Sequence, residues 1–529
     1  MVPRWRSFAA TLRSGELSTP VKIVGNSVVQ DKLPPEMLTR LERWELSPSL
    51  LTAAEFVEIC IVEGRESEAV DAARRLVAID KNAAPLIREQ AAKLLSRTGN
   101  LRDISPELKA SLNRPSRPRI MTRVHPRDPL AWVELALEQT IRGAGAAAER
   151  SVLVALQLAP HNRHVLRSAA RLFLHRDDRD RAFEIISRND ATRGDPWLIA
   201  SEVALAQVAE RSSRFLKSGS NMLQDQRFHP RHITELAGAI ATEELVHGNR
   251  KKSKKCFTQS LVDPTGSALA QGEWATSAFG GDGLVSESRL QSTFENDEAR
   301  AYHFYRMRRF AGVQEACDRW SENDPFSVRP FEFGATTAGL IEDFDVSLGF
   351  AQKGLAIRPT LPSLLNAQAF AAASLGRTDE ALAALDKIKV SEAPKIQQLI
   401  ALANRGLVAF RRGEETVGRS YYARAIEGFR ADGALEMAAR AKIYLAREAM
   451  LTRTSDWLEL LKDAKSAMGK FKDSEAIQSL SLVVKMASEI DQPSSEPQLQ
   501  GASSLAGEAL TNVRVTFDMK PLPIDPLSD

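Results

Sequence analysis

The stretch NAQAFAAASLGRTDEALAAL, residues 366–385, contains eight alanines and a single glycine near its middle. Alanine loses little entropy in a helix and buries little area, so it suits positions where two backbones lie close together. Apolar residues recur at helical spacing up to Gly376 and again after it. Gly376 can take the left-handed conformation that ends a helix. The stretch therefore predicts a hairpin of two helices, which must pack on neighbours to bury its apolar faces.

The same pattern recurs with a period of 34 residues. With Pro362 as the first position of a repeat, Val328 and Phe294 occupy that position one and two periods earlier. The eighth position of these repeats is alanine throughout: Ala301, Ala335 and Ala369. A separate copy starts at Pro129 and has alanine at its eighth, twentieth and twenty-seventh positions: Ala136, Ala148 and Ala155. Further copies start near Leu50 and Leu399.

This spacing resembles the tetratricopeptide repeat family, which has small residues at the eighth, twentieth and twenty-seventh positions and proline at the thirty-second. The resemblance implies an all-α fold, a right-handed α-solenoid of about a dozen helical hairpins over roughly residues 49–490. Ser347 and Gly418 depart from the family pattern because they stand at the twentieth position. Insertions are expected around residues 211–230 and 248–256.

Composition divides the chain into five segments. Residues 1–48 are an N-terminal arm, residues 49–113 a first group of repeats, and residues 129–490 the main array. Residues 114–128 are rich in proline and arginine, and they predict a basic linker that cannot continue a helix. Residues 491–529 open with a Pro/Ser-rich stretch and then alternate in the manner of a strand, which predicts a docking tail carrying Val513, Val515, Phe517 and Met519. A frayed terminus is the alternative.

Charge and cysteine content limit the classes of protein to consider. Charged residues form 26% of the chain but the net charge is only +3, so the chain as a whole is not expected to seek polyanions. Cys60 and Cys317 fall at small-residue positions of the repeats, which predicts buried thiols in a reducing compartment. No signal peptide or membrane-spanning stretch is apparent, so a cytoplasmic location is expected. The excess of arginine over lysine, with the alanine content, favours a bacterial origin.

The sequence contains no pattern typical of catalysis. It has no phosphate-binding loop, no nucleophile elbow and no His-Glu-x-x-His helix. Two His-x-x-His pairs lie beside prolines at repeat junctions: His161 with His164, and His229 with His232. Each pair lacks the third and fourth ligands that zinc needs. No catalytic, metal or cofactor site is therefore expected.

The first helix of each repeat carries a stripe that is separate from the hairpin contact and can line a concave groove. Aromatic residues and arginine on such a stripe are the types that most often carry interface energy. The predicted partner groove consists of Glu298, Tyr302, Tyr305, Arg306, Arg329, Glu332, Asn366, Phe370, Leu407, Phe410 and Arg411. Packing between repeats is the alternative role. Phe370 stands where carboxylate-binding family members need asparagine, so a folded partner or an internal peptide is favoured over a C-terminal tail.

Two basic segments make nucleic acid an alternative partner. The first consists of Arg114, Arg117, Arg119, Arg123 and Arg127, and the second of Arg250, Lys251, Lys252, Lys254 and Lys255. Such patches can neutralise phosphates. The alternative is solvated charge at helix ends and loops, which is favourable at helix C-termini.

Three function classes follow from these features. The favoured class is a non-catalytic scaffold or adaptor that binds a partner protein in the groove of the solenoid. The second is a nucleic-acid-contacting subunit of a larger complex, and the third is an enzyme whose site has no sequence signature. A second copy of the chain is among the candidate partners.

Overall fold

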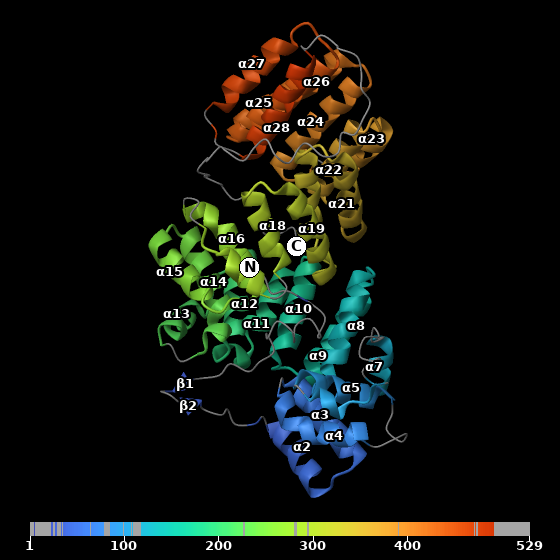
Figure 1. The fold of residues 1–529 in the computed structure, drawn as a ribbon, viewed down its shortest axis with the longest axis vertical. Coiled ribbons are helices and arrows are strands. Elements are labelled where there is room, and N and C mark those ends of the chain that lie inside the picture. The colour runs from blue at the N-terminus through green and yellow to red at the C-terminus, as the bar shows by residue number, and fades with distance from the viewer. Residues whose placement is uncertain are drawn as a thin grey trace.

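The computed structural model describes residues 5, 23–24, 27–28, 33, 35–63, 65–78, 85–98, 100–106, 108, 118–225, 228–279, 283–293, 296–389, 391–469, 471 and 474–490. Within these residues the chain is helical apart from one two-stranded ladder and the connecting turns. Figure 1 shows the helices stacked along the long axis, from the blue α2–α5 at one end to the orange and red α24–α28 at the other. The predicted all-α fold is confirmed.

The part before the main array contains two strands, five described α-helices and two short 3-10 helices, η1 (Glu66–Ala69) and η2 (Leu101–Asp103). The strands β1 (Ile23–Val24) and β2 (Ser27–Val28) pair antiparallel. The helices are α2 (Pro35–Leu46), α3 (Leu50–Val62), α4 (Val70–Ala78), α5 (Pro85–Arg97) and α7 (Pro118–Val124). The predicted N-terminal arm thus contributes a ladder and α2 to the fold. It also contributes Trp5, which is fully buried with its ring 5.5 Å from that of Phe326.

The helix α7 corrects part of the predicted linker, which was expected to hold no helix. Pro118 stands at the first position of α7, where the missing N–H costs nothing. The helix ends at Val124, shortly before Pro126, because proline restricts the residue that precedes it. The prolines therefore set the limits of this helix and do not prevent it. It packs on the first helix of the main array.

The main array consists of successive pairs of helices. Its first half contains α8 (Pro129–Ile141), α9 (Gly145–Leu158), α10 (Arg163–His175), α11 (Arg179–Ser187), α12 (Pro196–Val208), α13 (Leu216–Gln224), α14 (Pro230–Val246), α15 (Arg250–Ser260), α16 (Gly266–Thr276) and α17 (Glu287–Ser292).

The second half contains α18 (Asp297–Arg306), α19 (Phe310–Asn323), α20 (Arg329–Leu340), α21 (Phe344–Ile357), α22 (Pro362–Ser374), α23 (Thr378–Asp386), α24 (Lys395–Arg411), α25 (Glu415–Ala431), α26 (Leu435–Leu451), α27 (Trp457–Met468) and α28 (Ser474–Ile490).

One backbone conformation marks the turn inside most pairs. A residue with positive φ stands two positions after the first helix ends, as at Gly376 with φ of 79°. The others are Gly143, Asp177, Glu210, Gly248, Arg308, Glu342, Gly413 and Arg453. Arg308, Glu342 and Gly376 are each 34 positions apart, which confirms the repeat period. Only some of these residues are glycine, so the sequence reveals the turn at some repeats and hides it at others.

Small residues let the two helices of a pair approach closely. Ala335 and Ala369 are buried, as their place in the repeat predicts. Ser347, at the twentieth position, donates its hydroxyl to the Ala335 carbonyl oxygen at 2.8 Å. A Cβ on Gly418 would lie 3.0 Å from the carbonyl oxygen of Gly406 on the facing helix. Ser347 and Gly418, the two departures from the family pattern, are therefore both small enough for the close contact between the helices of a pair.

The irregular region of the array lies partly where the sequence predicted it. After α12, residues 209–215 precede a short α13, and α12 packs mainly on α14. An insertion at residues 248–256 was also expected, but Gly248 forms an ordinary turn there and the extra length belongs to the 17-residue α14. The sequence pattern is misleading at this point because a longer first helix shifts the period as an inserted loop does.

The three cysteines of the chain lie in the interior of the fold. Cys60, Cys256 and Cys317 are buried and unpaired, and burial raises the pKa of each thiol.

Among the helices that the structure describes, none combines the length and apolar character required to cross a bilayer.

Candidate partner-binding surface

The first helices of the pairs form one layer of the curved array. Each packs on the first helix of a neighbouring pair, for example α22 on α24, α24 on α26 and α14 on α16. The second helices pack mainly on first helices. In a curved stack the layer with the closer contacts lies on the inside, so the first helices make the inner face of the array.

Ion pairs join the first helices of different repeats along this inner face. We call them the inner charge pairs: Arg163–Asp195 (2.6 Å), Arg167–Glu235 (2.6 Å), Arg306–Glu273 (3.2 Å), Arg329–Glu298 (2.7 Å), Arg411–Glu448 (3.0 Å) and Arg440–Glu475 (2.5 Å). The acidic partners are mostly buried, and Glu273, Glu298 and Glu448 expose at most 1% of their side chains. Breaking such a pair leaves a buried charge without compensation, which is strongly destabilising.

Several predicted groove residues belong to these pairs. Arg329 donates to Glu298 and to the hydroxyl of Tyr302, and its guanidinium lies 5.3 Å from the centre of the Trp320 ring. Arg306 contacts Glu273, which His303 also approaches at 3.1 Å. The structure therefore brings these residues together, but as contacts between repeats.

Other predicted groove residues make neutral contacts between repeats. Glu332 accepts a hydrogen bond from Ser363 on the next first helix. Asn366 donates to the side chain of Gln397 at 3.0 Å and accepts from Asn404 at 3.2 Å. These contacts fix one first helix relative to the next.

The aromatic groove residues have different positions. Phe370 is half-buried, with its ring centre 5.3 Å from that of Tyr444. Leu407 and Phe410 are 1% and 2% exposed, and Phe410 packs against Tyr422 of the second helix of its own pair. Leu407 and Phe410 are therefore interior residues and do not line a groove. Phe410 stands one residue before the end of α24, as the buried Ala373 does in α22, so this position of the repeat belongs to the interior.

A buried cluster around Arg447 was missed by sequence reasoning. Arg447 is 2% exposed and contacts Glu448 at 2.8 Å and Glu342 at 3.1 Å. Its guanidinium lies 5.5 Å from the centre of the Phe370 ring and 5.2 Å from that of Tyr444. Adjacent Arg and Glu in a helix resemble surface residues, and Glu342 is 105 positions away, so no local pattern indicates the cluster.

The second basic segment forms the start of α15. Lys251, Lys254 and Lys255 are exposed, whereas Lys252 pairs with Glu244 at 2.6 Å and Arg250 donates to the Ala278 carbonyl. These cations are exposed at a helix end, as the alternative of solvated charge expects, but the end is the N-terminus, because three of the five cations stand in the first turn. Cations there oppose the helix dipole, at a cost of about 0.3–1 kcal/mol each.

The first basic segment is described only in part. Arg119, Arg123 and Arg127 are exposed on and beside α7. Arg114 and Arg117 lie outside the described residues, as does the predicted docking tail with Val513, Val515, Phe517 and Met519.

The paired histidines have structural contacts. His161 lies 3.1 Å from Asn189, and His229 accepts a hydrogen bond from the Arg231 backbone at the start of α14. Burial, with Arg163 and His229 nearby, lowers the pKa of His232 to about 4. Across the part of the chain that the structure describes, no cluster of three or more potential ligands is arranged to hold a metal ion.

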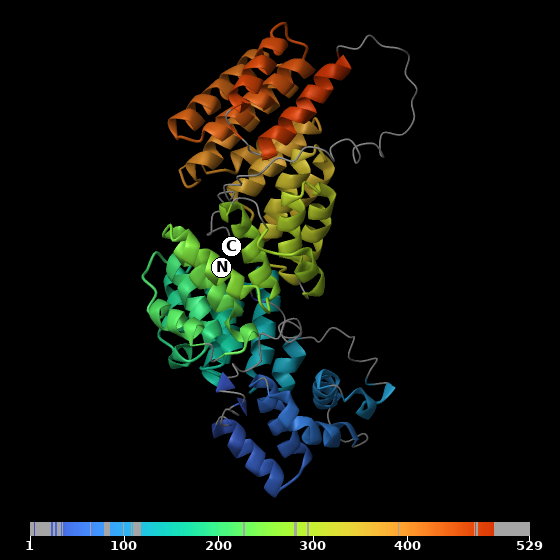
Figure 2. The same ribbon diagram turned by 60° about the vertical axis from the view of Figure 1, so that its left-hand side comes forward.

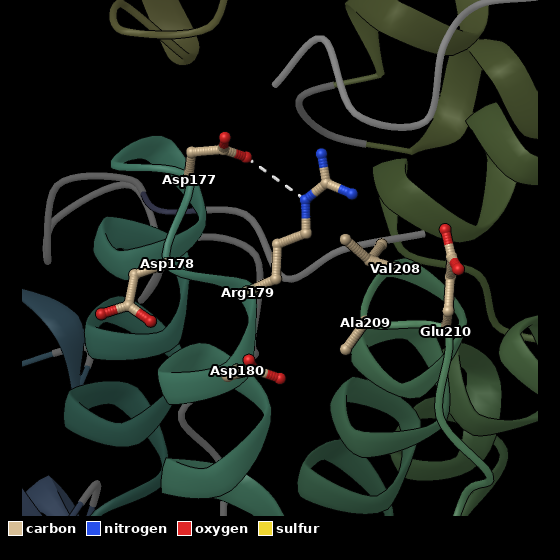
Figure 3. Close-up of a pocket in the computed structure, with 7 residues that line it drawn as sticks. All are labelled: Asp177, Asp178, Arg179, Asp180, Val208, Ala209 and Glu210. Atoms are coloured by element: carbon tan, nitrogen blue, oxygen red, sulfur yellow. Dashed lines mark hydrogen bonds and ion pairs between the residues drawn. The ribbon is translucent and has the colours of Figure 1, made fainter.

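One shallow pocket of about 260 Å³ opens between the turns after α10 and α12 (Figure 3). Its lining consists of Asp177, Asp178, Arg179, Asp180, Val208, Ala209 and Glu210. Asp178 caps α11 by accepting from the Arg181 amide, and Asp177 contacts Arg179 at 3.2 Å. These carboxylates compensate the positive end of a helix, so the pocket is explained by helix termination.

Comparisons with known proteins give matches among solved structures alone. No protein-family model and no curated protein matches the sequence. The chain is similar to the APC/C hetero-tetramer Cut9–Hcn1, with 12% identity, 85% of this chain and 92% of that chain covered, and a TM-score of 0.35. It is similar to yeast Tom70 with 12% identity, 83% and 96% coverage, and a TM-score of 0.30. The fold assignment rests on the helix pairs themselves and not on these similarities.

Proposed function

We propose that the chain is a non-catalytic scaffold that binds a partner protein on the inner face of its helical array. The observation that carries this proposal is the layer of first helices, linked by the inner charge pairs and carrying partly buried aromatic and arginine side chains. A rigid surface with such side chains loses little entropy on binding, so most of its contact energy appears as affinity.

The partner is expected to be a folded protein or an internal peptide. Buried ion pairs fix the positions of the repeats that form the inner face. Such a rigid surface suits one partner of matching shape better than many partners of different shapes. Phe370 and Arg329 are the anchors that we assign to this contact, because each is only partly buried and has rigid support from its neighbours.

The test starts from proteins captured by the tagged full chain and identified by mass spectrometry. An identified candidate is then purified and titrated against Phe370→Ala and against Val417→Ala, a change on the outer helix α25 where the side chain is 45% exposed. Loss of a central anchor should weaken binding by more than tenfold, whereas the outer change should have little effect. Equal weakening by both changes, or by neither, would remove the inner face as the site.

The basic start of α15 supports nucleic acid as a second candidate partner. The three exposed lysines place like charges close together, and Lys251 also opposes the helix dipole, so an anion that covers them is stabilised. Binding of duplex or single-stranded probes should then fall steeply between about 50 and about 200 mM salt. Lys254→Gln with Lys255→Gln should reduce both the affinity and the salt dependence, whereas Lys465→Gln on α27 should change neither.

A further inference from the structure

The last described helix, α28, lies over the inner layer and does not continue the stack. In a regular repeat, the first helix packs strongly on the second helix before it, as α22 does on α21 and α26 does on α25. By contrast, α28 packs mainly on α26, only slightly on α27, and also reaches α20. In Figure 2 the red α28 runs beside the orange helices and descends toward the yellow part of the array.

The polar contacts of α28 span the inner face. Glu475, in its first turn, accepts hydrogen bonds from the hydroxyl of Tyr305 on α18 and from Arg440 on α26. Tyr305 and Glu475 are 170 positions apart in the chain. One turn later, Ser479 lies 3.2 Å from the Tyr444 hydroxyl. Tyr305, a predicted groove residue, is therefore in contact with a helix that the chain itself places on the inner face.

The apolar contacts of α28 follow one stripe. Ala476, Val483 and Ala487 are buried in the same cluster as Ile443 and Ala446 of α26. Ser481, Lys485, Ser488 and Glu489 are exposed on the other side. This is the arrangement of an amphipathic helix in a groove, with apolar anchors at intervals of three or four residues. Ile477, Leu480, Val484 and Met486 of α28 are partly buried against the same cluster.

We propose that α28 is an exchangeable ligand of the inner face and that it competes with a partner helix of the same chemistry. That helix carries a carboxylate in its first turn, to meet Tyr305 and Arg440. Alanine, valine and larger aliphatic residues follow at helical spacing, to pack on α26. Release of α28 uncovers little of α27, because the two helices barely touch. The proposal rests on the proposed function and names both the partner chemistry and the group that it displaces.

The test uses the full chain and a fluorescent peptide of residues 474–490. In wild type, α28 covers the site, so peptide binding should be at least tenfold weaker than in a Val483→Asp chain, where a charge replaces a side chain that is 1% exposed. The matched control is Lys485→Asp, which adds the same carboxylate to an exposed position of α28 and should behave as wild type.

A further change identifies the site of the peptide. In the Val483→Asp chain, Arg440→Ala should weaken peptide binding at least tenfold, because the peptide's glutamate then has lost its cation. Circular dichroism and melting check that each variant is folded. If Val483→Asp prevents folding, Glu475→Arg serves in its place. This change puts a cation in the first turn of α28, where it is repelled by Arg440.

The outcomes separate this inference from the proposed function. A folded Val483→Asp or Glu475→Arg chain that does not bind the peptide would overturn the inference and make α28 a permanent cap. Binding that ignores Arg440→Ala would also overturn it. Partner capture by wild type does not depend on these results, so the scaffold proposal fails only if its own anchor test fails.

Discussion

Arginine on the inner face and lysine on α15 lie in opposite electrostatic surroundings. Each inner arginine in the six inner charge pairs has a carboxylate within 3.2 Å. On α15, Lys251, Lys254 and Lys255 are exposed in or just after a first turn that carries no acidic residue. In the sequence both groups are simply basic residues near aromatic or polar ones. The difference teaches that the inner cations hold the array together, whereas the outer ones are available to a partner.

The largest effect is expected at the centre of the inner face. Arg447→Met should lower the free energy of unfolding by about 3–5 kcal/mol, because the buried Glu448 loses one of its two guanidinium partners and the Phe370 ring loses its cation. Urea denaturation measures the change. The double change Arg447→Met with Glu448→Met should recover much of the loss, since no buried charge from this residue pair remains.

A smaller loss is expected where the pairs of helices touch. Ala335→Leu should cost about 1–3 kcal/mol, because the added atoms overfill the contact with α21. Thr336→Leu is the matched control, since its side chain is exposed on the same helix. Equal denaturation midpoints for the two variants would show that Ala335 is not at a close contact.

An effect of intermediate size on stability is expected at the buried carboxyl of Glu58, which has the carboxyl of Asp128 nearby. Burial, with Asp128 nearby, raises the pKa of Glu58 from 4.5 to about 7. The folded state then binds this proton more tightly than the unfolded state, so the stabilisation is present at low pH and is lost as the pH rises from about 4.5 to about 7. Glu58→Gln should therefore stabilise the protein by about 1–2 kcal/mol at pH 8 and by much less at pH 5. Melting curves at the two pH values decide it, and a benefit that is larger at pH 5 would contradict the sign.

The smallest effect is expected on α15. Replacing Lys251, Lys254 and Lys255 by Gln should change the free energy of unfolding by less than about 0.5 kcal/mol per residue, because these side chains are exposed. A small stabilisation is the expected direction for Lys251, which stands in the first turn and opposes the helix dipole. A loss as large as that at Arg447 would mean that the inner and outer cations have the same role.

The repeat was predictable because its signals are local. Ala335 and Ala369 mark helices that approach closely, and Gly376 marks the turn between two helices. All three signals lie within one 34-residue unit, so a short window of sequence contains them. The turns at Asp177 and Glu342 were not predictable in the same way, because tertiary packing imposes a positive φ on residues that do not favour it.

The predicted groove was only partly correct for a related reason. The repeat places Arg329 and Tyr302 on the inner face, where they contact Glu298. The same counting fails at Phe410, which stands one residue before the end of α24 and packs on Tyr422 of α25. The equivalent residue of α22, Ala373, is buried as well, so this position of the repeat belongs to the interior and does not line a groove.

The sequence by itself determined that this chain is an array of helical hairpins, because propensity, small-residue spacing and turn residues act within each repeat. Only the tertiary structure decided what covers the inner face. Arg447 meets Glu342 across 105 residues, and Glu475 meets Tyr305 across 170. Such contacts depend on the curvature accumulated over several repeats, and no single repeat encodes that curvature. The physical reason is that each repeat fixes its neighbour locally, whereas the sum of those small rotations decides which distant side chains meet.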